Sequence, residues 1–199
     1  MAKNAHSGCK NTARSAAAMY NPMLDRPPED YKGWLIRTDF RIGVQIQLCL
    51  SDPALSEQER LAVALGLLYG NGVPELQTAL DGLSWFMSCG TENTPDSSAG
   101  PEVYSFELDA GRIVSAFRKV FGLDLCRERL HWFLFVSMLG DLDNTAFTSV
   151  IEIRRTPEGE VAQQRRAEFR RMKRRFSLHG QYSEEEKEHL DSIIRQAKA

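Results

Sequence analysis

The strongest constraint on the fold is a series of helix-boundary signals along the chain, of which the one at Ser56 is the clearest. Ser56 and Glu59 form a capping box, in which each side chain binds the free backbone amide of the other residue. Leucines at helical spacing follow, and Gly70 interrupts the pattern after Tyr69. Because caps, apolar stripes and breaks alternate in this way, we expect an all-α protein with a single helical domain of about seven helices.

The other expected helices have similar boundary signals. Pro74 suits the first turn of one helix, Asp109 can cap another, and Gly122 ends that helix at the left-handed C′ position. Ser183 and Glu186 repeat the capping box near the C-terminus. The expected helices span residues 40–50, 56–69, 74–88, 109–121, 130–139, 145–155, 158–176 and 184–197.

The segment 40–50 is ambiguous between helix and strand. Its apolar residues occupy alternate positions, as they would in a strand, but Phe40, Val44 and Leu48 also form a helical stripe. Asp39 offers an N-cap directly before it. We favour a helix here, with a strand as the alternative.

Three parts of the chain are expected to differ in structure. Residues 1–23 are small and polar without hydrophobic periodicity, which is typical of a disordered leader. Residues 24–156 are expected to form the helical core domain, with a short β-hairpin around Lys32 and Gly33. Residues 157–199 are expected to form a charged C-terminal helical arm.

The composition excludes several classes of protein. With 42% apolar and 26% charged residues, the 199-residue chain is not collagen-like, disulfide-rich or wholly disordered. Its longest uncharged apolar stretch, residues 131–140, is too short for a membrane helix, and the N-terminus lacks the apolar segment of a secretory signal. Four cysteines without a Cys-x-x-Cys pair favour reduced thiols in a cytosolic compartment.

Charge is unevenly distributed. Residues 1–153 carry 13 Lys/Arg and 19 Asp/Glu, residues 154–179 carry 9 and 3, and residues 180–199 carry 3 and 5. A basic segment on an acidic body indicates an interaction surface. The cations expected to bind a partner are Arg165, Arg166, Arg170, Arg171, Lys173, Arg174 and Arg175.

An apolar stripe beneath these cations would dock their helix and leave the charges facing outward. The stripe consists of Val161, Phe169, Met172 and Phe176. The targets that fit are nucleic-acid phosphate, an acidic membrane surface or an acidic protein face. The alternative is a solvated surface helix that the acidic run at residues 184–188 partly neutralises.

Large apolar residues at helical spacing predict the core. They are Leu65, Leu68, Trp85, Phe86, Phe117, Phe121, Leu130, Trp132, Phe133 and Phe135. Four residues could instead line a groove for an amphipathic helix of another protein: Trp85, Phe86, Met87 and Trp132. The pattern does not distinguish a core from a groove.

We expect no enzymatic activity, no metal and no cofactor. His131 could pair with Cys126 or Cys89, but it lies in the most apolar segment, which favours a buried structural histidine. His6 and Cys9 have a ligand-like spacing without a second pair. No nucleotide-binding, zinc-protease or serine-hydrolase motif occurs in the sequence.

Several short sequence motifs, taken in their order along the chain, resemble those of one protein family. They are Ile36-Arg-Thr-Asp-Phe-Arg41, Ala64-Leu-Gly-Leu-Leu-Tyr-Gly70 with Pro74, Trp85-Phe86 with Cys89-Gly90, Tyr104-Ser-Phe-Glu-Leu-Asp-Ala110, Ala116-Phe117, Phe121-Gly-Leu-Asp124 and Leu130-His-Trp-Phe133. Their order and spacing resemble the bacteriophage family named for gene product fifteen of a Gram-positive siphophage. The resemblance covers residues 24–178.

The resemblance implies a function in tail morphogenesis. Members of the family resemble non-enzymatic tail assembly chaperones, which hold the helical tape-measure protein soluble in the host bacterial cytoplasm. The implied partners are the tape-measure protein and the tail tube protein. A second copy of the chain is a further expected partner, and we expect no binding to a membrane. The alternative is a nucleic-acid-binding accessory phage protein that acts through residues 165–175, although the acidic body makes nucleic acid the less favoured partner.

Overall fold

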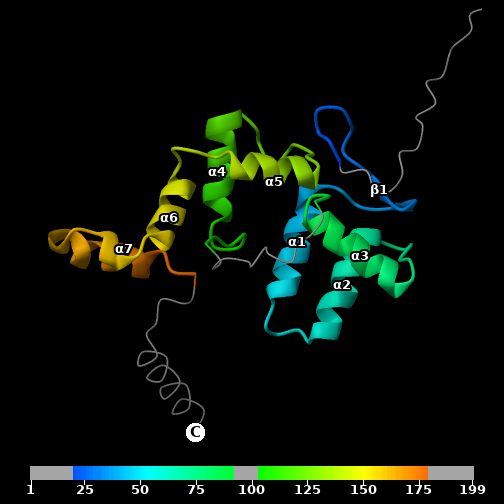
Figure 1. The fold of residues 1–199 in the computed structure, drawn as a ribbon, viewed down its shortest axis with the longest axis horizontal. Helices are drawn as coiled ribbons and strands as arrows, with labels where there is room; N and C mark the ends of the chain where they lie inside the picture. The colour runs from blue at the N-terminus through cyan, green and yellow to red at the C-terminus, as the bar shows by residue number, and fades with distance from the viewer. Residues whose placement is uncertain (1–19, 92–102, 179–199) are drawn as a thin grey trace, which may run out of the picture. The chain divides into compact units, whose positions relative to one another are not determined.

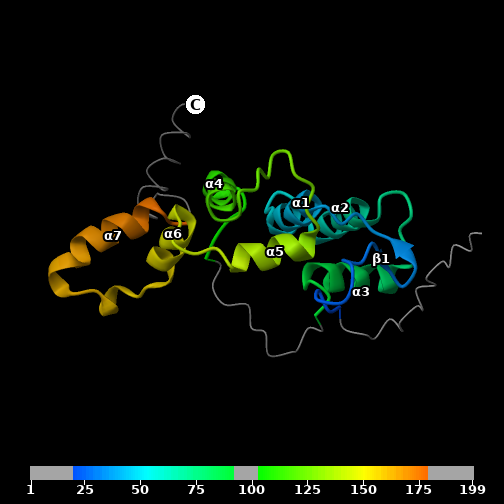
Figure 2. The same cartoon turned by 90° about the horizontal axis from the view of Figure 1, so that it is seen from above.

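The computed structural model describes residues 20–91 and 103–178, shown in Figure 1 and from above in Figure 2. Over these residues the chain forms seven α-helices, one two-stranded sheet and two 3-10 turns. The prediction of an all-α fold with a short N-terminal hairpin is confirmed. None of the described helices is long and apolar enough to cross a membrane. The helix predicted over residues 184–197 and most of the predicted leader lie outside the described residues.

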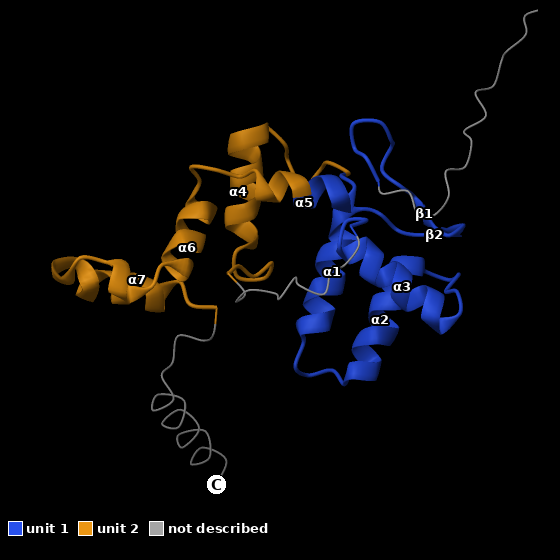
Figure 3. Cartoon of the chain, in the orientation of Figure 1, with its two compact units in different colours: residues 1–95, 130–136 blue, residues 96–129, 137–199 orange. Residues whose placement is uncertain are grey.

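The chain divides into two compact units, coloured separately in Figure 3. The first comprises residues 1–95 and 130–136, and the second comprises residues 96–129 and 137–199. The division passes through α5 (Trp132–Gly140), so this helix supplies residues to both units. The three-part division expected from the sequence stays a prediction.

A tight hairpin lies near the start of the first unit. Strands β1 (Asp30–Tyr31) and β2 (Trp34–Leu35) pair antiparallel across Lys32 and Gly33. Both turn residues have positive φ, 51° and 84°, which a type I′ turn requires. The Asp30 carboxylate accepts a hydrogen bond from the Gly33 backbone N–H at 3.0 Å. The hairpin predicted around these residues is therefore confirmed.

The ambiguous segment folds as helix α1 (Phe40–Ser51), so the helical interpretation is confirmed. As predicted, Asp39 caps it: its carboxylate accepts a hydrogen bond from the backbone N–H of Arg41 at 3.0 Å. The helix backbone packs closely on the buried indole of Trp132 at Gly43, where an added Cβ would overlap the ring.

Helix α2 (Glu57–Tyr69) packs against both α1 and α3 (Leu76–Met87), and the three lie together in both views (Figure 1, Figure 2). The predicted capping box forms at its start. The Ser56 hydroxyl accepts from the Glu59 N–H, and the Glu59 carboxylate accepts from the Ser56 N–H at 2.9 Å. This local signal therefore places the first turn of α2 correctly.

Two helices begin later than predicted. Pro74 lies before α3 and not in its first turn, because Glu75 is extended, with ψ 151°, and the helix begins at the following residue. Helix α5 begins at Trp132 and not at Leu130. The Trp132 N–H donates a hydrogen bond to the carbonyl of Thr38, a residue outside the helix, at 2.7 Å.

Most of the predicted core residues are buried. The buried ones are Leu65, Leu68, Phe86, Phe117, Trp132, Phe133 and Phe135. The half-buried ones are Trp85, Phe121 and Leu130. In the first unit the Trp132 ring stacks with Phe86 and Phe135 at centroid distances of 6.2 and 5.8 Å. These stacked rings form the centre of that unit.

The second unit is built on α4 (Ala110–Phe121), α6 (Ala146–Arg155) and α7 (Arg166–Arg175). Helix α6 packs against both α4 and α7. As predicted, Gly122 ends α4 in the left-handed region, with φ 70°. The side chain of Thr145 caps α6. Within the unit, α6 therefore lies between α4 and α7 in the series of packed helices.

The single helix predicted over residues 158–176 is wrong in its first part. Two 3-10 turns, η1 (Glu158–Glu160) and η2 (Gln163–Arg165), precede α7. Between them Val161 and Ala162 are extended, with ψ 134° and 136°. Extended residues cannot continue the i→i−4 hydrogen-bond ladder of an α-helix, so α7 is shorter than predicted.

Candidate partner-binding surface

Helix α7 carries four exposed arginines on one side. They are Arg170, Arg171, Arg174 and Arg175, and we call them the arginine face. With about 100° of rotation per residue, these positions fill an arc on the side opposite Phe169. Phe169 is buried, so the helix docks through its apolar side and leaves the arginine face in solvent.

Two other cations of the predicted set have local structural contacts. Arg166 donates from Nε to the Val161 carbonyl at 3.0 Å and from Nη2 to the Gly159 carbonyl at 3.3 Å. The ammonium group of Lys173 lies 6.0 Å from the centroid of the Phe169 ring, a cation–π distance. Both cations are half-buried, and their contacts stabilise α7 and the turns before it.

The arginine face has few partners. Nε of Arg170 lies 3.0 Å from Oε2 of Glu158, and both side chains are exposed. The Arg175 guanidinium lies 5.6 Å from the centroid of the Phe176 ring. Within the part of the chain that the structure describes, three side chains of the predicted set make no ion pair or hydrogen bond: Arg165, Arg171 and Arg174. Their charges are directed to solvent.

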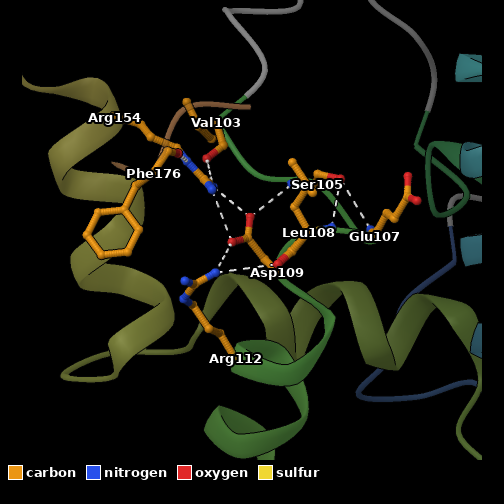
Figure 4. A network of polar contacts seen from close by, with 8 residues as sticks. All are labelled: Val103, Ser105, Glu107, Leu108, Asp109, Arg112, Arg154 and Phe176. Atoms are coloured by element: carbon orange, nitrogen blue, oxygen red, sulfur yellow. Dashed lines mark hydrogen bonds and ion pairs between the residues drawn. The ribbon is translucent and has the colours of Figure 1, made fainter. Parts of the chain in front are cut away.

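A buried carboxylate, that of Asp109, holds the C-terminal end of α7 through Arg154 (Figure 4). Arg154 donates to Asp109 from Nη1 to Oδ2 at 2.6 Å and from Nη2 to Oδ1 at 3.1 Å. The same guanidinium donates from Nε to the Phe176 carbonyl at 2.6 Å and from Nη1 to the Val103 carbonyl at 3.0 Å. Arg154 thus links the start of α4, the end of α6 and the residue that follows α7.

A second arginine joins the same two residues. Arg112 donates from Nη1 to Oδ1 of Asp109 at 2.9 Å, and its guanidinium lies 5.3 Å from the centroid of the Phe176 ring. Figure 4 shows both arginines directed at the one carboxylate. Phe176 is therefore held by its carbonyl through Arg154 and by its ring through Arg112.

The charges of this network set the ionisation of Asp109. Burial alone would raise the pKa of Asp109, because it removes the charged form from water. The hydrogen bonds from Arg154 and from the Ser105 backbone, with the charges of Arg154 and Arg112, outweigh burial and bring the pKa below its ordinary value of 3.8. Asp109 is therefore a carboxylate at neutral pH and compensates the buried charge of Arg154.

The sequence pattern placed Asp109 correctly at the start of a helix but assigned it a different role. Its side chain makes no capping hydrogen bond to α4. It accepts instead from the Ser105 N–H at 3.1 Å and from the two arginines. Arg154 is 45 residues away in the sequence, so no local pattern could identify it as the partner.

The four residues considered for a groove lie in or beside the core of the first unit. Phe86 and Trp132 are buried, whereas Trp85 and Met87 are half-buried. The Trp85 ring lies 5.1 Å from that of Tyr31, centroid to centroid. The exposed large apolar side chains among the described residues of this unit are others: Met23, Leu24, Trp34, Leu35, Leu48, Val63, Val73, Leu76 and Leu134.

His131 and Cys89, which were considered as a catalytic pair, have structural environments. Nε2 of His131 lies 2.9 Å from the Pro28 carbonyl, and Nδ1 accepts a hydrogen bond from the Phe133 N–H at 3.1 Å. Because Nδ1 accepts, the ring proton is on Nε2 and is donated to Pro28. Burial raises the pKa of the Cys89 thiol to about 11, the direction opposite to nucleophile activation.

Metal-ligating side chains do not gather in the described part of the chain. No group of three or more His, Cys, Asp or Glu side chains that could hold a metal ion occurs there. His6 and Cys9, which have a ligand-like spacing, lie outside the described residues. The expected lack of a metal and of a cofactor stays a prediction.

The fold and this surface define a small helical protein with a concentrated cationic face. Residues 28–178 match the family described as Bacteriophage Gp15 protein, and the chain belongs to this family. The match includes the hairpin, all seven described helices and the Asp109 network. The family resemblance inferred from the sequence is confirmed, and the chain is a phage protein of the structural and morphogenesis class. No curated protein and no solved structure matches the chain.

Proposed function

We propose that this protein is a non-enzymatic tail assembly chaperone that binds helical segments of the tape-measure protein in the host cytoplasm. Membership of the Bacteriophage Gp15 family supports a morphogenesis role, and the resemblance described above supports the chaperone role. The task requires a surface that attracts and releases a helical chain without changing it chemically. The tail tube protein and a second copy of this chain are further proposed partners.

The proposal rests on the arginine face of α7. Unpaired surface charge that complements the charge of a partner accelerates association by steering the two molecules together. Arg171 and Arg174 have no partner among the described residues, and Phe169 holds the helix so that these charges stay in solvent. We therefore assign the arginine face to the first encounter with acidic stretches of the tape-measure protein.

Exposed apolar side chains of the first unit support a second type of contact. Leu35 is 76% exposed, Leu76 is 67% exposed, and the Trp34 side chain is 44% exposed. Exposed apolar groups bind the apolar side of an amphipathic helix, which covers them and is itself covered. The apolar side of a tape-measure helix would suit this surface of the first unit.

Co-expression with the tape-measure protein of the same phage tests the proposed function. The variant Arg171→Gln/Arg174→Gln removes two charges of the arginine face. The matched control, Arg118→Gln/Arg127→Gln, removes two exposed charges of the same unit, each of which faces Asp124 at 3.7 or 3.9 Å. We expect the wild type and the control to keep the tape-measure protein soluble and the first variant to keep less of it soluble. An unchanged soluble fraction with and without the wild-type protein would contradict the proposal.

The arginine face also supports a second candidate, a nucleic-acid-binding accessory protein. Cations that neutralise phosphates release counterions, so the logarithm of DNA affinity falls with the logarithm of salt concentration by about 0.9 per phosphate. The excess of 19 Asp/Glu over 13 Lys/Arg in residues 1–153 opposes this candidate. Tight, sequence-independent DNA binding with that salt slope, and no effect on the tape-measure protein, would favour it.

A further inference from the structure

We propose that the acidic C-terminal segment of this chain, residues 183–191, occupies the arginine face until an acidic partner displaces it. The inference rests on the proposed function, because it assigns a regulation to the same surface. The occupant is a segment of the same molecule, and its contact with the surface is reversible. A partner then binds only when it competes successfully with this segment.

The two stretches have complementary charge. Residues 165–175 contain seven Lys/Arg and one Glu, whereas residues 183–191 contain five Asp/Glu and one Lys. Among the described residues, Glu158 is the carboxylate that pairs with the arginine face, and it reaches Arg170. The acidic segment is the next concentration of carboxylates along the chain after α7.

The connection between the two stretches is long enough for the contact. From residue 178, the last residue that the structure describes, to residue 183 an extended chain spans about 17 Å. Helix α7 has 10 residues and is therefore about 15 Å long. The connection includes Gly180, and glycine is the residue type for which reversed backbone conformations carry no steric penalty. The acidic segment can therefore reach every residue of the arginine face.

The Asp109 network fixes the point from which the acidic segment starts. Arg154 binds the carbonyl of Phe176, and Arg112 lies against its ring. The chain therefore leaves this anchor one residue after Arg175, the last member of the arginine face. Without the anchor, the end of α7 could fray and the acidic segment would explore a larger volume.

Weak ion pairs are sufficient for an intramolecular competitor. Exposed pairs are individually weak, but a short connection gives the tethered segment an effective concentration in the millimolar range. Occupancy by the segment multiplies the apparent affinity for any other acidic ligand by the fraction of molecules in which the arginine face is free. If about four fifths of the molecules are occupied at low salt, removal of the competing charges strengthens that binding by about fivefold.

A binding assay with fluorescent poly-L-glutamate as the probe tests this inference on the full chain. The test variant carries four substitutions: Glu184→Gln, Glu185→Gln, Glu186→Gln and Glu188→Gln. The control carries the same change of net charge at exposed positions outside the C-terminal arm: Glu57→Gln, Glu75→Gln, Glu107→Gln and Glu152→Gln. At low salt we expect the test variant to bind the probe about fivefold more tightly than the wild type, and the control to remain within about twofold of it.

Three outcomes would overturn the inference. One is equal affinity of the test variant and the wild type, and another is the same gain in the control, which would indicate net charge alone. The third is a gain that depends on protein concentration, because the occupant would then be the acidic segment of a second copy. The probe contains no tail protein, so these outcomes are independent of whether the tape-measure protein is the partner.

Discussion

Asp109 and Arg154 form a buried bidentate ion pair, with N–O distances of 2.6 and 3.1 Å, that joins the start of α4 to the end of α6. The Asp109 side chain is 0% exposed and that of Arg154 is 9% exposed. Removal of one member of such a pair leaves the other charge buried without compensation. The packing of the second unit, including the anchor of α7, therefore depends on this contact.

We expect the substitution Asp109→Asn to lower the free energy of unfolding by about 3–5 kcal/mol, because it leaves Arg154 charged and buried. The matched control, Glu158→Gln, breaks the exposed pair with Arg170 and should cost no more than about 1 kcal/mol. Urea denaturation of both variants measures the difference. Similar stabilities for the two variants would mean that the buried pair is not the anchor.

Two helix glycines should respond in opposite ways to a single methyl group. A Cβ at Gly43 would overlap the Trp132 ring, whereas a Cβ at Gly66 would meet nothing within 4 Å. We expect Gly43→Ala to destabilise the protein by about 1–3 kcal/mol through overpacking. Gly66→Ala should stabilise it by about 0.5–1 kcal/mol, because alanine loses less conformational freedom in a helix. Thermal melts of both variants provide the test, and a stable Gly43→Ala variant would contradict the packing of α1 on Trp132.

The stability of the first unit should fall in mild acid because of His131. Burial lowers its pKa below the ordinary 6.5, although the hydrogen bond to Pro28 and the charge of Glu29 act in the opposite direction. In the window below pH 6.5 the unfolded chain binds more protons at this site than the folded chain. The contribution to the free energy of unfolding is therefore complete above that pH and is lost as the pH falls toward the folded pKa.

The variant His131→Asn removes this titration and is the natural comparison. Denaturant unfolding at about pH 7.5 and pH 5.5 should show a larger loss of stability for the wild type than for the variant. Protonation of Nδ1 would remove the acceptor for the Phe133 N–H in the folded protein. Equal losses for the two proteins would indicate that His131 does not titrate in this range.

Local signals predicted much of the fold, because the groups that cap a helix or form a turn are sequence neighbours. The capping box of Ser56 and Glu59 and the left-handed end at Gly122 depend on residues within one helical turn. The hairpin turn at Lys32 and Gly33 is equally local. Each of these features could therefore be recognised from spacing alone.

Features that depend on distant partners could not be predicted. The role of Asp109 depends on Arg154, which α6 brings to it. The helical periodicity of residues 158–176 did not reveal the break before α7. Arg166 binds the carbonyls of Val161 and Gly159 only once the turn has folded. The charge of the arginine face was evident from the sequence, but its anchor at Phe176 was not.

The role of the arginine face is tested most directly by the rate at which the protein associates with a fragment of the tape-measure protein over a series of salt concentrations. The variant carries Arg170→Gln, Arg171→Gln, Arg174→Gln and Arg175→Gln, and the control carries Arg118→Gln and Arg127→Gln. Because exposed charge pairs contribute at most about 1 kcal/mol each, the melting temperature of the variant should be nearly unchanged. We expect the wild-type rate to fall as salt is added. At low salt the variant should associate about tenfold more slowly than the wild type, and the control should not. A folded variant that associates as fast as the wild type at low salt would contradict the assignment of the arginine face to partner binding.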